Sequence, residues 1–265
     1  MFAIIRRNWQ MYRRYFPFTL FINRILGSAF QLISIWLIAN FLFNNQVSPK
    51  MSGYMTTDHY FTYAAIGILF YNLGVATLMN VGRALITEVR EGTLMSLLIT
   101  PYKVFQYFSG VFLEQLWRTL LEFAALLGIS QLLGADFSGI RLWAWLAGIL
   151  FTVWVSFGMS IFLANIMLQL RDTYISQNTL FILIYLVSGI TFPKELLPKF
   201  LQLIGELLPL TQALEVFRIL CFQPESYTRL PYLITIGFSS SLVYLFAGLY
   251  WYRKTEQKII SYIFE

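Results

Sequence analysis

Four charged residues fall within long apolar stretches of the sequence and are the first candidates for chemistry. Glu114, Arg118 and Glu122 follow one another at intervals of four residues, which places them on one face of a helix. Arg24 lies in an earlier apolar stretch. Charged side chains at membrane depth are costly and usually face protein or a water-filled cavity. Three interpretations are open: ion pairs that lock two helices together, a transport pathway that meets a polar group of the substrate, or, for Glu122, a place at the membrane surface.

Little in the sequence supports catalysis or metal binding. Cys221 is the only cysteine and His59 the only histidine, so the chain offers no intrachain disulfide, no thiolate metal site and no histidine cluster. A membrane-embedded serine protease needs a histidine at membrane depth, whereas His59 falls in a polar loop. The phosphate-binding pattern G-x-x-x-x-G-K-S/T does not occur in the sequence. We therefore expect no catalytic residue, no metal ion and no cofactor bound by this chain.

The composition predicts an integral membrane protein. Of the 265 residues, 58% are apolar and 12% are charged, and the mean hydropathy is +0.64. Soluble domains are about 45–50% apolar and about 25% charged. These values exclude a soluble globular protein and a disordered chain. The apolar runs continue for about twenty residues or more, which indicates membrane-spanning helices rather than the alternating strands of a barrel.

The apolar runs predict six spans in one transmembrane domain that covers 1–265. Before them, Trp9, Tyr12 and Phe16 share one helical face and arginines take the other, which predicts an amphipathic helix over 1–16 in the headgroup layer. A signal peptide is the alternative, but Arg24 interrupts its apolar core. The predicted fold class is therefore an all-α polytopic membrane protein. The predicted spans are 18–43, 60–81, 104–133, 142–170, 173–192 and 232–252.

Lysine and arginine are distributed unequally between the two sides that these spans create. The side with both termini holds eleven of the 19 basic residues, the other side holds six, and two lie inside spans. Because basic residues are enriched in cytoplasmic loops, both termini are predicted to be cytoplasmic. The eleven are Arg6, Arg7, Arg13, Arg14, Arg83, Arg90, Lys103, Arg171, Arg253, Lys254 and Lys258, and the six are Lys50, Arg141, Lys194, Lys199, Arg218 and Arg229.

The charged segment after the second predicted span contains a turn signal. Gly92 can end one helix in a left-handed conformation, and Thr93 can cap the next. The leading edge of this segment carries Glu88, Arg90 and Glu91, and the short helix that follows has an apolar face of leucines. Two interpretations remain: a solvated loop anchored by its leucines, or a docking helix for a cytoplasmic partner.

The long segment 193–231 before the last span is only partly apolar. Its apolar stripe is too short to span a membrane and is interrupted by prolines. This pattern predicts short re-entrant helices that dip in from the outer face and are buried against protein. A helix lying flat at the interface is the alternative. The prolines are Pro193, Pro198 and Pro209, and the stripe contains Leu197, Phe200, Leu201, Ile204 and Leu208.

Two parts of the sequence resemble the permease subunits of type-2 ATP-binding-cassette (ABC) exporters. The run 90–94 (REGTL), continued to 100–101 (TP), is similar to that family's loop after the second span. The run 188–193 (SGITFP), followed by 208–211 (LPLT) and 215–218 (EVFR), is similar to its segment between spans 5 and 6. The resemblance covers essentially the whole chain, from the amphipathic start to the long segment before the last span.

The resemblance implies an assembly of several subunits in a bacterial plasma membrane. Two permeases, identical or homologous, would form a dimer, and separate ATPase subunits would bind ATP and Mg. Membrane lipid is a further expected partner, and nucleic acid is not. The segment 83–103 would seat its helix in the ATPase, and the outer segment would form a gate. The coupling residues would be Thr87, Glu88, Arg90, Glu91, Gly92, Thr93, Leu94, Leu97 and Leu98, and the gate residues Pro193, Leu197, Pro198, Phe200, Leu201 and Pro209.

The same resemblance implies the function. The chain would move an amphipathic or lipophilic substrate, such as a drug, antibiotic, peptide or lipid, out of the cytoplasm or inner leaflet by alternating access. One alternative is the export of a lipid-linked glycan. Another is an ATP-independent secondary carrier, which would have no reason to keep both motifs.

Overall fold

A computed structural model describes residues 6–7, 9–10, 18–43, 59–99, 104–170, 179–222 and 224–264. Within these ranges the secondary structure is helical and contains no β-strand element. Most of the predicted amphipathic helix over 1–16 lies outside the described residues, and so does the first part of the predicted span 173–192. The fold is therefore all-α, as the sequence predicts.

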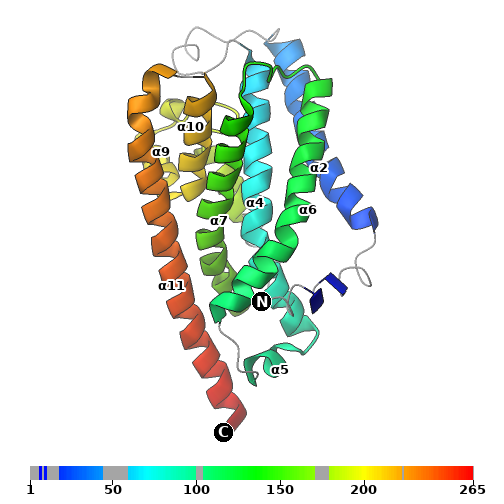
Figure 1. Cartoon of the computed structure of the whole chain (residues 1–265), viewed down its shortest axis with the longest axis vertical. Helices are drawn as coiled ribbons and strands as arrows, with labels where there is room; N and C mark the ends of the chain where they lie inside the picture. Colours follow the sequence, from blue (N-terminus) through cyan, green and yellow to red (C-terminus); the bar gives the residue numbers. More distant parts are fainter. Residues whose placement is uncertain are drawn as a thin grey trace.

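Long helices run side by side along the long axis of the molecule (Figure 1). Helix α7 packs between α4 and α11, while α2 and α6 pack against α4. Large apolar side chains such as Phe30 on α2 and Phe246 on α11 remain exposed, which suits contact with lipid. The bounds are α2 Phe18–Leu37, continued by a π-helical turn η1 Ile38–Leu42, α4 Tyr60–Arg90, α6 Val104–Leu132, α7 Leu142–Leu170 and α11 Leu230–Phe264.

Four of the described helices are long and apolar enough to cross a membrane. They are Ile22–Leu42, Tyr60–Arg90, Leu142–Leu170 and Tyr227–Gln257. Helix α6 is equally long, but its charged residues and glutamines lower its hydropathy. Helix α8, Phe181–Val187, is short, and the residues just before 179 lie outside the described ranges. The chain is thus a multi-pass membrane protein, and the count of six spans stays a prediction.

Two helices end at places other than the expected span limits. Helix α4 continues past the expected limit at Val81 because its inner face stays apolar, with Leu85 and Ile86 buried. It ends only where Gly92 adopts a φ of +70°. Helix α8 ends before Gly189, whose φ of +69° turns the chain.

Aromatic rings fill the centre of the bundle. The rings of Phe70 on α4 and Phe217 lie 4.1 Å apart between centroids, and Trp145 on α7 stacks on Phe70 and packs at a tilt against Phe217. Phe217 belongs to α10, Pro209–Phe222, which follows the short helix α9, Lys199–Leu207. The core therefore ties the outer segment to the central helices.

The helix α5, Leu94–Ile99, and the loop between α6 and α7 lie at opposite ends of the bundle (Figure 1). The helix α5 lies at the end where α11 finishes (Figure 1). The N-terminal part lies there too, because Arg7 pairs with Glu88 near the end of α4.

Candidate coupling turn, charged cavity and outer segment

A tight turn joins α4 to α5. The N–H of Glu91 donates to Thr87 O at 2.9 Å, and the N–H of Thr93 donates to Glu88 O at 3.0 Å. The φ of +70° confirms the left-handed conformation predicted for Gly92. Thr93 O then accepts the N–H of Leu97 at 3.0 Å and starts the next helix. Hydrogen bonds thus fix the direction of α5 relative to α4.

Glu88 faces the protein and not the solvent. Its exposed fraction is 4%, and its carboxylate accepts a hydrogen bond from Thr93 Oγ1 and pairs with Arg7. Arg90 and Glu91, in contrast, are exposed. The predicted coupling residues therefore fall into two groups, one that builds the turn and one that is free to meet a partner. Gly92, Thr93 and Ser96 are also exposed, Thr87 and Leu97 are half-buried, and Leu94 is buried.

The four charged residues that the sequence places inside spans form two separate ion pairs. Glu114 and Arg118 pair with each other within α6, and both are buried. Arg24 Nη2 lies 3.1 Å from Glu122 Oε2, which joins α2 to α6. The structure thus brings Arg24 to Glu122 and leaves Glu114 and Arg118 as an internal pair of one helix.

The pair of Arg24 and Glu122 lines a cavity. A cavity of about 230 Å³ lies between α2, α4, α6 and Phe181 of α8, and its wall includes Arg24, Arg83 and Glu122. The sequence interpretation missed Arg83, which it counted as a loop residue. A signal was present, because Arg83 follows Asn72, another wall residue, by eleven residues, or about three helical turns.

Neutral polar groups connect the helices around this cavity. Ser28 Oγ donates to Asn72 Oδ1 at 2.9 Å, and Asn72 Nδ2 donates to Gln31 Oε1 at 3.4 Å. These bonds tie α2 to α4, as polar side chains commonly do between membrane helices. Glu122 Oε1 is buried and has no hydrogen-bond partner among the described residues.

Prolines set the start of three helical elements in the outer segment. Pro193 precedes the 3₁₀ turn η3, Lys194–Leu196, Pro198 precedes α9, and Pro209 is the first residue of α10. Proline suits the first helical turn because its missing N–H has no helical partner there. Leu197 and Leu201 are half-buried, while Phe200 is 68% exposed.

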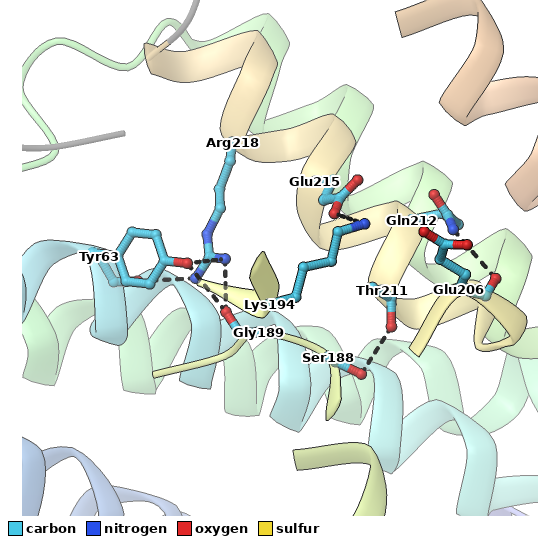
Figure 2. Close-up of polar contacts among 9 residues, drawn as sticks. All are labelled: Tyr63, Ser188, Gly189, Lys194, Glu206, Thr211, Gln212, Glu215 and Arg218. Carbon is cyan, nitrogen blue, oxygen red and sulfur yellow. Dashed lines mark hydrogen bonds and ion pairs between the residues drawn. The ribbon is translucent and has the colours of Figure 1, made fainter. Parts of the chain in front are cut away.

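A buried arginine holds the turn between α8 and η3. Arg218, only 7% exposed, donates from Nη1 to Gly189 O at 2.7 Å (Figure 2). Its Nη2 donates to Ile190 O at 3.0 Å. Nη1 also donates to Tyr63 Oη at 2.8 Å, and the guanidinium carbon lies 3.7 Å from the centre of the Tyr63 ring. Arg218 was counted as an outer basic residue in the sequence, and the structure instead assigns it a buried role.

Further contacts fix the same turn. Thr211 Oγ1 donates to Ser188 Oγ at 3.0 Å, and Lys194 pairs with Glu215 (Figure 2). On the other side α4 approaches so closely that a Cβ at Gly67 would lie 2.1 Å from Ile190 O. Contacts from α4 and α10 therefore hold the turn at 188–193 in one position.

The comparison with known families decides the identity of the chain. A family model described as ABC-2 type transporter matches residues 1–222, which is most of the chain. The chain belongs to the ABC-2 type transporter family. No curated protein matches it significantly. As a member of this family, the chain is a membrane permease component of an ABC transporter.

The three regions of this ABC-2 permease differ in what they offer chemically. The turn after α4 presents exposed charges, the cavity presents guanidinium groups and a carboxylate, and the outer segment presents apolar side chains on a fixed frame. No group of three or more His, Cys, Asp or Glu side chains within the described ranges is placed to hold a metal ion. The arrangement is that of a binding and transport protein.

Proposed function

We propose that this chain is the membrane-spanning subunit of an ATP-driven exporter. It moves an amphipathic or lipophilic substrate out of the cytoplasm or inner leaflet, and a separate ATPase subunit binds ATP and Mg. The observation that carries the proposal is the turn between α4 and α5, which presents exposed charges on a frame fixed by hydrogen bonds. A solvated loop would need no such frame.

The proposed topology has six spans with both termini in the cytoplasm of a bacterium. In its support, α5, the end of α11 and the paired Arg7 all lie at one end of the bundle (Figure 1). The sequence assigns most lysines and arginines to this side, and basic residues are enriched on the cytoplasmic side of a membrane.

The coupling step needs a contact that differs between two states of the ATPase. A ligand shifts a conformational equilibrium only by its differential affinity for the two states. ATP bound below the membrane must therefore change a contact that reaches the spans. In our proposal the exposed Arg90 and Glu91 make that contact, and Glu88 positions them by holding Thr93 and Arg7.

The outer segment acts as the outer gate in the proposed dimer. Its helix α9 exposes an apolar face, which suits a second permease subunit, identical or homologous, or lipid. That face contains Phe200, Leu203 and Leu207, each more than 60% exposed. Alternating access requires this segment to separate from its partner when the substrate leaves.

Co-purification of the ATPase tests the proposal. A tagged permease is purified from its native host, and we expect an ABC ATPase to co-purify with it. A variant with Arg90→Glu and Glu91→Lys should insert normally but lose this ATPase, because close charge pairs at an interface contribute roughly 2–5 kcal/mol when one partner is lost. Arg253→Glu, a charge reversal on the exposed part of α11 at the same end, is the control and should retain it. If the wild-type permease co-purifies with no ATPase, the proposal is wrong.

Labelling of single cysteines tests the topology. In a Cys221→Ser background, a membrane-impermeant reagent should reach Ser138→Cys from outside intact cells and should reach Thr93→Cys only after the cells are opened. Both positions are exposed, and they lie at opposite ends of the bundle. Labelling of Thr93→Cys from outside would contradict the proposed orientation.

A further inference from the structure

The cavity between α2, α4 and α6 contains an unbalanced charge. Arg24 and Glu122 neutralise each other as an ion pair, 3.1 Å apart. Arg83 lines the same cavity, and no carboxylate in the described part of the chain lies within ion-pair distance of it. The wall therefore has two guanidinium groups and one carboxylate. A cationic wall at this depth favours an anionic ligand, because an unpaired charge away from water is costly.

The cavity also holds an acceptor that has no donor. Glu122 Oε2 takes the ion pair with Arg24, while Glu122 Oε1 is buried without a hydrogen-bond partner in the described ranges. Leaving a buried acceptor unsatisfied is costly, and more so for a charged group. A ligand suited to both features would carry an anionic group for Arg83 and, next to it, a hydrogen-bond donor for Glu122.

The rest of the wall combines the polar side chains of Ser28, Asn72 and Thr119 with a larger apolar part. The apolar part includes Leu73, Val75, Met79, Phe123 and Leu126. The cavity volume is about 230 Å³. Roughly eight water molecules occupy the same volume in liquid water, at about 30 Å³ each. Pockets for drug-sized ligands have about 300–1,000 Å³, so this cavity fits a headgroup better than a whole amphiphile.

We propose that this cavity binds the headgroup of an amphiphile that carries a phosphate or carboxylate beside a hydrogen-bond donor. Arg83 receives the anionic oxygens, since a guanidinium presents paired N–H groups that match phosphate and carboxylate. Glu122 Oε1 accepts from the neighbouring donor, and the apolar part of the wall meets the start of the acyl or alkyl part. That such a molecule is also cargo rests on the proposed export function, whereas the binding does not.

Two sources can supply this headgroup, the surrounding bilayer and the exported substrate. Binding is measured first on the purified permease in an uncharged maltoside detergent, by calorimetric titration. The probes are dihexanoyl-phosphatidylethanolamine, which has an N–H donor beside its phosphate, dihexanoyl-phosphatidylcholine, which has none, and inorganic phosphate. We expect the ethanolamine lipid to bind at least five-fold more tightly than the choline lipid and at least ten-fold more tightly than phosphate.

Substitutions at Arg83 test the assignment without disturbing an ion pair. Arg83→Gln should lower the affinity for the ethanolamine lipid at least ten-fold and Arg83→Lys by less, while the unfolding temperature should not fall. Arg141→Gln removes an exposed guanidinium at the start of α7, outside the cavity, and should leave binding unchanged. Equal affinity of wild type and Arg83→Gln would overturn the proposal, and so would phosphate binding as tightly as the lipid.

Transport separates this inference from the proposed function. In reconstituted vesicles that contain the ATPase, ATP-driven movement of a headgroup-labelled amphiphile, lost in Arg83→Gln, identifies the ligand as cargo. If Arg83→Gln loses binding but the wild-type protein shows no ATP-driven movement of the amphiphile, the ligand is a bilayer lipid. The inferred binding site then stands, and the proposed export of this amphiphile fails. Undiminished transport of this amphiphile by Arg83→Gln means that the site is not on its export route, and if binding is unchanged as well the inference is overturned, although the chain would still be an exporter.

Discussion

Replacement of Gly67 by alanine should weaken the attachment of the outer segment to α4. The added Cβ would lie 2.1 Å from Ile190 O and 2.8 Å from the carbonyl carbon. Carbon and oxygen need more than 3 Å, so the helix and the turn must separate by about 1 Å. Overpacking of this kind costs about 1–3 kcal/mol.

The same movement affects a hydrogen bond. The bond from Arg218 to Ile190 O, 3.0 Å long, would lengthen to about 4 Å and be lost. A hydrogen bond to a charged group contributes about 1.5–3 kcal/mol, and alanine regains about 1 kcal/mol through its helix propensity. We therefore expect Gly67→Ala to lower the free energy of unfolding by about 1.5–5 kcal/mol.

Thermal unfolding of the permease in detergent measures this effect. Gly128→Ala in α6 is the matched control, because a Cβ there meets no atom within 4 Å, and its unfolding temperature should stay equal or rise. A cysteine reagent should also reach Cys221, half-buried on α10, more quickly in Gly67→Ala than in the control. If the two alanine variants unfold at the same temperature, α4 does not hold the turn in the way described.

Three further substitutions test other contacts. Arg218→Gln should lower the free energy of unfolding by about 3 kcal/mol, because carbonyl groups of the turn lose charged donors. The same substitution at the exposed Arg229 should change it by less than about 0.5 kcal/mol, and equal effects of the two substitutions would contradict the buried role of Arg218. For the pair of Arg24 and Glu122, a double-mutant cycle with glutamine at each position should give a coupling of about 1 kcal/mol, since Arg24 is partly exposed, and additive single effects would show that the pair contributes nothing. Gly92→Ala should cost about 1–2 kcal/mol through its positive φ alone, because its Cβ has open space, whereas Gly92→Asn should cost less, and an alanine variant that unfolds at the wild-type temperature would rule out this strain.

The helical bundle and the turn at Gly92, where α4 ends, were predictable from the sequence. The other helix ends were not, because the sequence predicts membrane boundaries and not the ends of the helices themselves. Apolar runs of about twenty residues identify membrane helices, because lipid offers no hydrogen-bond partner and the backbone N–H and C=O groups must bond to each other within the helix. A glycine after a charged helix end is a strong local signal for a left-handed residue. The limit expected at Val81 was, in contrast, a membrane boundary, and nothing in the sequence stops the helix itself before Gly92.

The buried polar contacts were the least predictable part. Arg218 finds its partners at Tyr63 and at two backbone carbonyl groups, and Glu88 finds Arg7 far away along the chain. Every residue has a backbone carbonyl group whatever its side chain, so the pattern of residue types cannot indicate which carbonyl groups Arg218 contacts. Arg83 is different, since its place three turns after Asn72 was visible in the sequence.

The unbroken length of α4 has a mechanical consequence. From Tyr63, which contacts Arg218, to Arg90 at the other end, the helix rises about 40 Å at 1.5 Å per residue. It contains no proline, the commonest cause of a sharp bend. A tilt of this rod by about 5° around the Arg90 end would carry Tyr63 through about 3.5 Å, more than a hydrogen bond can stretch. A rotation of a few degrees at the turn before α5 is therefore sufficient to release the contacts at the far end of the same helix.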